Sequence, residues 1–438
     1  MSSQRLRPLD GMEKYHAARC FQGMDTCIAL SARYTTRGDT PLTKEILFPA
    51  LKNVIEAHAP LGVRFDGDVA FFRLPRIDLS RVVEFSNKDV QTAMEEQLSR
   101  VFDPSQEDMP LWRVEVLPGN LVLLAMNHVI GDGLSAVTFH RSLLRALHKT
   151  SDHDFSPSSV VDVPDTPFPP SVFDVINTRP SWSASFKMLC FGLLPGPLNQ
   201  AYWSWTGKAF PASVTSTKTH FRLITIPSST TEKLHSACRS HGASITGLLY
   251  ELIVVTLSRL IAGSGFTTAF INVPVSLRPF IDTSVARTDD LCNYVASVQD
   301  FAPLHAAFSW DGAAATTASI AQRKAYAAGN LGFLSWMGDS KAFNRASLGK
   351  KRMISVTLSN IGRVNHDDAP SDSDKWKMGD LVWGQGDSVI GPAMGVNVIG
   401  DPEGGLVISV TWGLKSVDAE FGEEFTTSLR DGLLKMVT

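Results

Sequence analysis

Apolar and polar residues along the chain follow both helical and strand spacing, which predicts a protein built from both kinds of element. Residues 42–58 repeat apolar side chains every three or four positions, as expected of a helix with one buried face. Further helices are predicted over 12–19, 86–101, 134–147, 229–241 and 244–261. Strands are predicted over 26–34, 112–117, 121–126 and 220–226, and a strand-to-loop transition over 268–278. After the segment 353–361, a hairpin is predicted to join 395–399 to 406–412.

The clearest local pattern is a hairpin that ends in a short polar motif. Residues 112–117 alternate in polarity, 118–120 are Pro-Gly-Asn, and 121–126 are apolar throughout. The second strand is therefore expected to be central in its sheet and buried on both faces. A helix follows at 134–147, so the unit predicted is strand, motif and helix.

The spacing of prolines divides the chain. Residues 151–185 are rich in Pro, Ser and Asp, which is typical of a crossover and not of a packed element. We therefore expect an α/β (α+β) fold of two lobes, the first at 1–165 and the second at 216–438, joined by a linker at 166–215.

Composition narrows the class of protein. The chain has 438 residues, 44% hydrophobic and 19% charged, and its net charge is −3 (41 basic, 44 acidic), so nucleic acid is not an expected partner. Its five cysteines are scattered and no Cys/His cluster has zinc spacing, so neither a disulfide framework nor a metal site is expected. The first residues lack the apolar stretch of a secretory signal, and the apolar run at 188–197 is too short to span a membrane, so a cytoplasmic protein is predicted.

The motif at 127–133 carries the candidate chemistry. His128 ends the predicted buried strand, and Asp132 follows it between Gly131 and Gly133. An imidazole is the usual protein base near neutral pH, and a strand end would hold it firmly. The glycines are expected to let the following turn bend sharply.

The sequence resembles the fungal alcohol O-acetyltransferase family, within the superfamily of chloramphenicol acetyltransferase (CAT), plant acyl-CoA-dependent acyltransferases and peptide-synthetase condensation domains. The specific match is the segment 127–133, in which 128–133 form a His-x-x-x-Asp-Gly motif. It is supported by segments that occur in the family's order, at 7–13, 273–278, 293–295 and 358–362. Asn127 stands where many condensation domains carry a first histidine. The plant Asp-Phe-Gly-x-Gly motif has only a loose echo at 380–386.

The resemblance implies two CAT-like lobes with a tunnel between them, where His128 would act as general base on an acceptor hydroxyl. Asp132 and Gly133 would be structural, with Asp132 paired to Arg278 and not to His128. Asn360 is the first candidate for stabilising the oxyanion, ahead of Ser359 and Thr357, although capping of a turn before Gly362 explains Asn360 equally well. Phosphates of coenzyme A would meet an exposed basic cluster, of which Lys350, Lys351 and Arg352 are one candidate.

The function expected is acyl transfer, with acetyl the first choice, from acyl-CoA as cosubstrate to a small hydroxylated molecule, such as a fungal secondary metabolite. No tightly bound cofactor and a monomeric protein are expected. Two alternatives stay open. The acyl group could come from an acyl carrier protein, or the fold could serve as a binding scaffold or catalyse another rearrangement.

Overall fold

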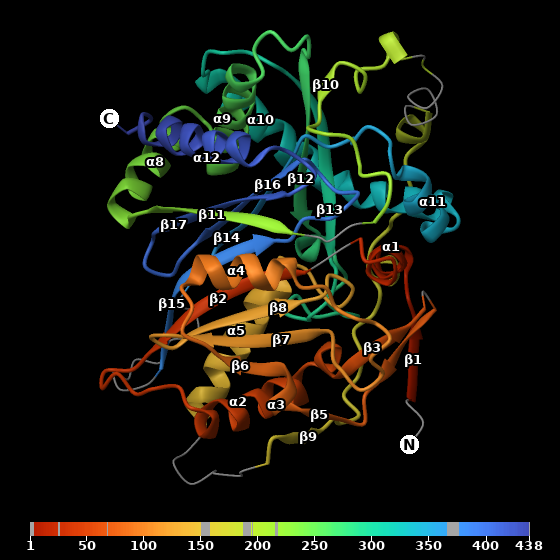
Figure 1. Cartoon of the computed structure of the whole chain (residues 1–438), viewed down its shortest axis with the longest axis vertical. Helices are drawn as coiled ribbons and strands as arrows, with labels where there is room; N and C mark the ends of the chain where they lie inside the picture. Colours follow the sequence, from red (N-terminus) through yellow and green to blue (C-terminus); the bar gives the residue numbers. More distant parts are fainter. Residues whose placement is uncertain are drawn as a thin grey trace.

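The fold is taken from a computed structural model and is described here for all residues except 1–3, 25–26, 68, 150–157, 187–193, 195, 215–217, 366–375 and 438. Two mixed β-sheets lie one above the other, each covered by helices (Figure 1). The mixed α/β fold predicted from the sequence is confirmed. The tunnel and the lobe boundaries at 165 and 215 stay predictions.

The lower sheet has five strands in the order β15-β2-β8-β7-β6. Its strands are β2 (Ile28–Thr35), β6 (Val83–Phe85), β7 (Trp112–Leu117), β8 (Leu121–Met126) and β15 (Lys377–Gln385). The predicted hairpin is β7–β8, and β8 is the central strand, with all six residues buried. Helices α2 (Lys44–Ala57), α4 (Val90–Ser99) and α5 (Gly133–Lys149) pack around this sheet.

The upper sheet has seven strands, six of them in the order β10-β12-β14-β16-β17-β11, with β13 paired to β12. They are β10 (Ser204–Trp205), β11 (Thr219–Ile226), β12 (Thr268–Ser276), β13 (Val295–Pro303), β14 (Val356–Arg363), β16 (Met394–Gly400) and β17 (Leu406–Gly413). Helices α8 (Ser228–Ser240), α9 (Ile245–Leu260), α10 (Trp310–Arg323) and α12 (Ala419–Leu434) belong to this half. The predicted hairpin at 395–412 is β16–β17.

Strand β15 links the two halves. It comes after most of the upper sheet in the chain, yet it pairs antiparallel with β2 at the edge of the lower sheet. Its Trp383 carbonyl accepts a hydrogen bond of 2.6 Å from Ser409 on β17. The segment with only a loose echo of the plant motif is therefore mostly a strand that joins the lower sheet to the upper one.

Helix α1 (Gly11–Phe21) lies beside the junction of the two halves (Figure 1). A capping box starts it, because Asp10 accepts from the backbone of Glu13 while Glu13 accepts from the backbone of Asp10. Arg7, on β1 (Gln4–Pro8), also binds both carboxylate oxygens of Glu13 at 2.7 Å. The helix is thus fixed to the strand before it.

Within the described residues, no single helix combines the length and apolar character needed to cross a membrane. Helices α8 and α9 meet both criteria only when taken together, and they are bent by 91° relative to each other.

Candidate active site

His128 lies in a short loop that the end of β8 holds in place. The backbone N–H of Asn127 donates to Leu111 at 2.8 Å, which extends the β7–β8 ladder by one step. The Asn127 side chain then accepts from the N–H of Val129 at 2.9 Å. Asn127 is buried, and its side-chain amide holds the loop in a fixed conformation. The His128 ring, which is partly exposed, is therefore carried by a rigid backbone.

Asn293 determines the tautomer of His128. Its Nδ2 donates to the backbone carbonyls of His128 at 2.5 Å and Val129 at 3.1 Å, and only the amide nitrogen can make those bonds. The Asn293 Oδ1 therefore points at the ring, 3.0 Å from Nδ1 of His128. The proton must lie on Nδ1, so Nε2 carries the free lone pair that a general base needs.

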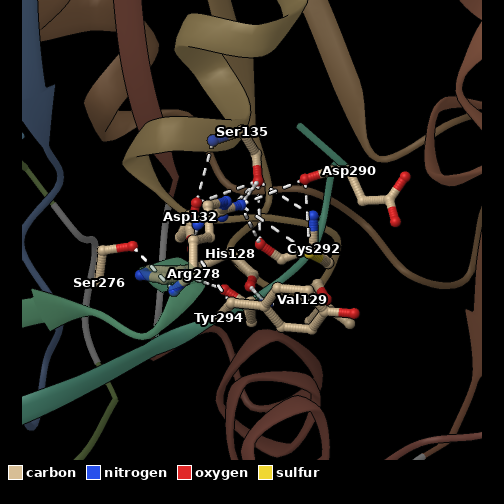
Figure 2. A network of polar contacts seen from close by, with 10 residues as sticks. His128, Val129, Asp132, Ser135, Ser276, Arg278, Asp290, Cys292 and Tyr294 are labelled. Atoms are coloured by element: carbon tan, nitrogen blue, oxygen red, sulfur yellow. Dashed lines mark hydrogen bonds and ion pairs between the residues drawn. The ribbon is translucent and has the colours of Figure 1, made fainter. Parts of the chain in front are cut away.

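Asp132 and Arg278 form a buried ion pair, the contact that the family resemblance implies (Figure 2). Arg278 Nη1 donates to Oδ2 of Asp132 at 2.6 Å, and both side chains are 7% exposed. Burial raises the pKa of Asp132, but the charge and hydrogen bond of Arg278 outweigh it, and the net pKa lies below its ordinary value. Asp132 makes no hydrogen bond to His128 among those that the described residues form.

The same ion pair positions Asn293. Asp132 Oδ2 accepts from the N–H of Tyr294 at 3.1 Å, and Arg278 Nη2 donates to the carbonyl of Cys292 at 3.2 Å. These bonds fix the residues on both sides of Asn293 (Figure 2). Asp132 thus acts on the His128 ring through the backbone that carries Asn293. The catalytic and structural roles themselves stay predictions.

The two glycines of the motif lie where there is no room for a side chain. Neither Gly131 nor Gly133 has a positive φ, so the turn expected of them does not use the left-handed conformation that favours glycine. A Cβ on Gly131 would lie 2.7 Å from Cβ of Ser135, and one on Gly133 would lie 2.7 Å from a methyl of Ile361 and 3.0 Å from the Trp383 ring. Glycine is needed at 133 because β14 and β15 approach it closely, and at 131 because the side chains of Ser135 and Met126 do.

The three oxyanion candidates lie on opposite faces of β14. Asn360 donates from Nδ2 to Thr246 on α9 at 3.1 Å and accepts from the N–H of Gly362 at 2.9 Å. It therefore faces the helix layer, and the turn-capping role is the one that the geometry supports. Because side chains alternate along a strand, Thr357 and Ser359 share the face of Ile361, which contacts Gly133. The geometry therefore favours Ser359 and Thr357 over Asn360, the first candidate, and the oxyanion role itself stays a prediction.

Thr357 and Ser359 differ in their contacts. Thr357 accepts from Nδ2 of Asn272 at 3.4 Å, which leaves its own O–H able to donate. Among the described residues, the hydroxyl of Ser359 has no hydrogen-bond partner, and the residue is 5% exposed. Its O–H is free to donate to a ligand on the side of the sheet that faces the His128 loop.

The basic cluster at 350–352 is not the exposed group that was expected. Arg352 is 2% exposed, with Nε donating to the Lys208 carbonyl and Nη1 to the Gly391 carbonyl, both at 3.0 Å. Lys351 is exposed, but its Nζ donates to the carbonyls of Ala201 and Tyr202. The prediction of an exposed, phosphate-binding side chain is wrong for Arg352, because its guanidinium is buried and donates to backbone carbonyls. A phosphate-binding role for Lys350 stays a prediction.

Two residues that contact His128, Asn293 and His16, were not predicted from the sequence to belong to the site. Asn293 belonged to a matched segment, but nothing indicated its contact with His128 across 165 positions. His16 on α1 stacks on His128, with ring centroids 4.2 Å apart and planes 14° apart. No spacing in the sequence joins His16 to the motif.

Comparisons with known proteins support one family. The family model described as "Alcohol acetyltransferase" matches residues 74–430. A probable alcohol acetyltransferase, FCK4 of Fusarium pseudograminearum, is 25% identical over 377 residues, which cover 78% of this chain and 75% of that protein. The probable alcohol acetyltransferase crmB of Aspergillus fumigatus is 23% identical over 381 residues, covering 78% and 79%.

Solved structures show the same fold at low identity. The trichothecene 15-O-acetyltransferase TRI3 of Fusarium sporotrichioides superposes with a TM-score of 0.70 at 14% identity, over 99% of this chain and 94% of that one. The condensation domain of the monacolin K polyketide synthase MokA gives a TM-score of 0.61 at 14% identity, over 100% and 98%.

Proposed function

The chain belongs to the alcohol acetyltransferase family and is an acyltransferase, and from this premise we propose that it moves an acetyl group from acetyl-CoA to a hydroxyl of a small molecule, with His128 as general base. The observation that carries the proposal is the tautomer of His128. Asn293 holds the proton on Nδ1 and leaves Nε2 free to accept one.

The reaction proposed needs no covalent enzyme intermediate. Nε2 of His128 takes the proton of the acceptor hydroxyl as its oxygen attacks the thioester carbonyl. The tetrahedral intermediate then expels the thiolate of coenzyme A, which takes the proton back from the imidazolium. The Ser359 hydroxyl is the donor we assign to the oxyanion, because it faces the His128 loop without a described partner.

Release of free coenzyme A thiol from acetyl-CoA, measured with a panel of hydroxylated acceptors, tests the proposal. A general base contributes about 10²–10⁴-fold, so His128→Ala should lower turnover by that order while the protein stays folded. The matched control is His235→Ala on α8, an exposed histidine of the other half.

Two results would overturn parts of the proposal. If His128→Ala kept near-normal turnover, His128 would not be the base. If no acceptor released thiol from acyl-CoA but an acyl carrier protein served as donor, the donor would be the carrier.

A further inference from the structure

The stacked pair of His16 and His128 joins helix α1 to the proposed base. The two rings are nearly parallel, at 14°, with centroids 4.2 Å apart. His16 is 9% exposed, so its ring is a fixed part of the wall beside His128 and not a mobile surface group. The ring of Tyr15 also meets the His16 ring edge to face, with centroids 5.6 Å apart.

Helix α1 is fastened to both halves of the molecule. At its start, Arg7 of β1 holds Glu13. Near its end, Arg19 donates to the Ile390 carbonyl at 3.4 Å, and Gln22 donates to the Lys341 carbonyl at 3.0 Å. A side chain carried by such a helix has little freedom to move, so His16 presents a rigid face to His128.

The hydrogen bond of His128 leaves its ring one motion, which the ring of His16 can restrict. The bond from Nδ1 to Asn293 fixes one edge of the ring, but a single hydrogen bond allows the ring to rock about it. The nearly parallel His16 ring, stacked on the face of His128, opposes this rocking. The direction of the Nε2 lone pair is therefore set by two contacts at right angles, one in the ring plane and one on its face.

We propose that His16 is a positioning residue for His128. Its stacked ring holds the His128 plane so that Nε2 points at the acceptor hydroxyl, and it lies against the imidazolium that forms when His128 takes the proton. The inference rests on the proposed function of His128 as base.

Three replacements separate stacking from other roles. His16→Phe keeps a flat ring, whereas His16→Leu and His16→Ala remove it. We expect His16→Phe to retain kcat within about threefold, and His16→Leu and His16→Ala to lose about ten- to a hundredfold in kcat. The KM values for the acyl donor and the acceptor should stay within about twofold, because a misaligned base slows chemistry without weakening binding. His220 on β11, whose ring stacks on Trp412 with centroids 5.3 Å apart, supplies the control His220→Ala, for which kcat should not change.

A double-mutant cycle shows whether His16 acts through His128. In the His128→Ala background, His16→Ala should have no further effect on the residual rate. A loss in that background equal to the loss in the wild type would make His16 an independent group and overturn the proposal. So would a His16→Phe variant as inactive as His16→Ala, since that would assign a proton or hydrogen bond to His16, or a His16→Ala variant with normal kcat.

Ring proton shifts from NMR test the stack without any turnover. The shift that the His16 ring imposes on the His128 protons should be lost in His16→Ala and kept in His16→Phe. If the wild type shows this shift but no acetyl transfer, the proposed function fails while the stack stands. If the wild type shows activity but no such shift, the positioning role is wrong.

Discussion

Asn293 is the residue on which the chemistry of His128 depends most directly. Its amide both accepts from Nδ1 and ties down the carbonyls of His128 and Val129. We predict that Asn293→Ala lowers kcat by about 10², because the ring can then adopt the other tautomer and lose its base. Steady-state kinetics measure this, and nitrogen chemical shifts of the ring report the tautomer.

Asn293→Asp is the matched variant for that prediction. Its carboxylate still accepts from Nδ1 but cannot donate to the two carbonyls, so it should retain more activity than Asn293→Ala. Equal kcat for the wild type and Asn293→Ala would show that the tautomer does not depend on Asn293.

At this scale the sequence identified only residues that belong to a local motif or its matched partner. His128 and the Asp132–Arg278 contact could be predicted. Asn293 and His16 could not be assigned roles, because their contacts with His128 depend on packing between segments far apart in the chain. The order of Ser359 and Asn360 depended on which face of β14 meets the lower half, which alternation alone does not specify.

Elements with strong patterns were predicted within a few residues, and weakly patterned ones were not. Helices α2, α5 and α9 and the two hairpins follow from apolar periodicity. Strand β15 was missed because Gly379 and Gly384 interrupt its pattern, and its pairing with β2 crosses most of the chain. Nonlocal pairing of this kind leaves no periodic signal.

The first turn of α5 gives a test of close packing. Gly133→Ala would improve helix propensity, yet its methyl would meet Ile361 and Trp383. We predict a loss of about 1–3 kcal/mol in the free energy of unfolding, measured in denaturant, because overpacking a rigid site costs that much. The control is Gly432→Ala on α12, where the nearest atom is a leucine methyl at 3.2 Å and a gain of up to about 1 kcal/mol is expected. A stabilised Gly133→Ala would contradict this account.

Helix α5 also carries a buried histidine whose protonation opposes folding. Burial lowers the pKa of His140 from 6.5 to about 4, against a smaller opposing effect of its hydrogen bond to Leu30. The folded state therefore favours the neutral ring, and the stability it contributes is present above pH 6.5 and lost as pH falls toward 4. The slope is at most about 1.4 kcal/mol per pH unit.

His140→Gln removes this titration while it keeps a donor for the Leu30 carbonyl. We predict a flatter pH dependence of the unfolding free energy between pH 6.5 and 4, with the remaining slope due in part to His58, whose pKa burial also lowers to about 4. An unchanged slope in His140→Gln would show that His140 does not govern acid stability.

At the scale of the whole molecule, the site exists only where the two halves meet. The base comes from the end of a lower strand, Arg278 follows an upper strand, and α1 and β15 each contact both halves. The sequence predicted two α/β halves from its pattern. It could not predict the strand and helix that connect them, because their contacts form only once both halves are folded.

The Asp132–Arg278 pair is the buried charge contact through which the halves hold the His128 loop. Removing one partner leaves the other charged and buried, so Asp132→Ala and Arg278→Ala should each lower the free energy of unfolding by about 3–5 kcal/mol. The exposed pair Arg287–Asp289 is the control, and Asp289→Ala should cost less than about 1 kcal/mol.

Activity should fall together with stability in these variants, because the backbone on both sides of Asn293 loses its anchors at Asp132 and Arg278. The double variant Asp132→Ala/Arg278→Ala should be less destabilised than the sum of the single changes, since neither charge is then left unpaired. Denaturant unfolding and thiol release on the same samples measure both effects. If Asp132→Ala lost turnover while its unfolding free energy stayed unchanged, Asp132 would take part in the chemistry and not in holding the two halves together.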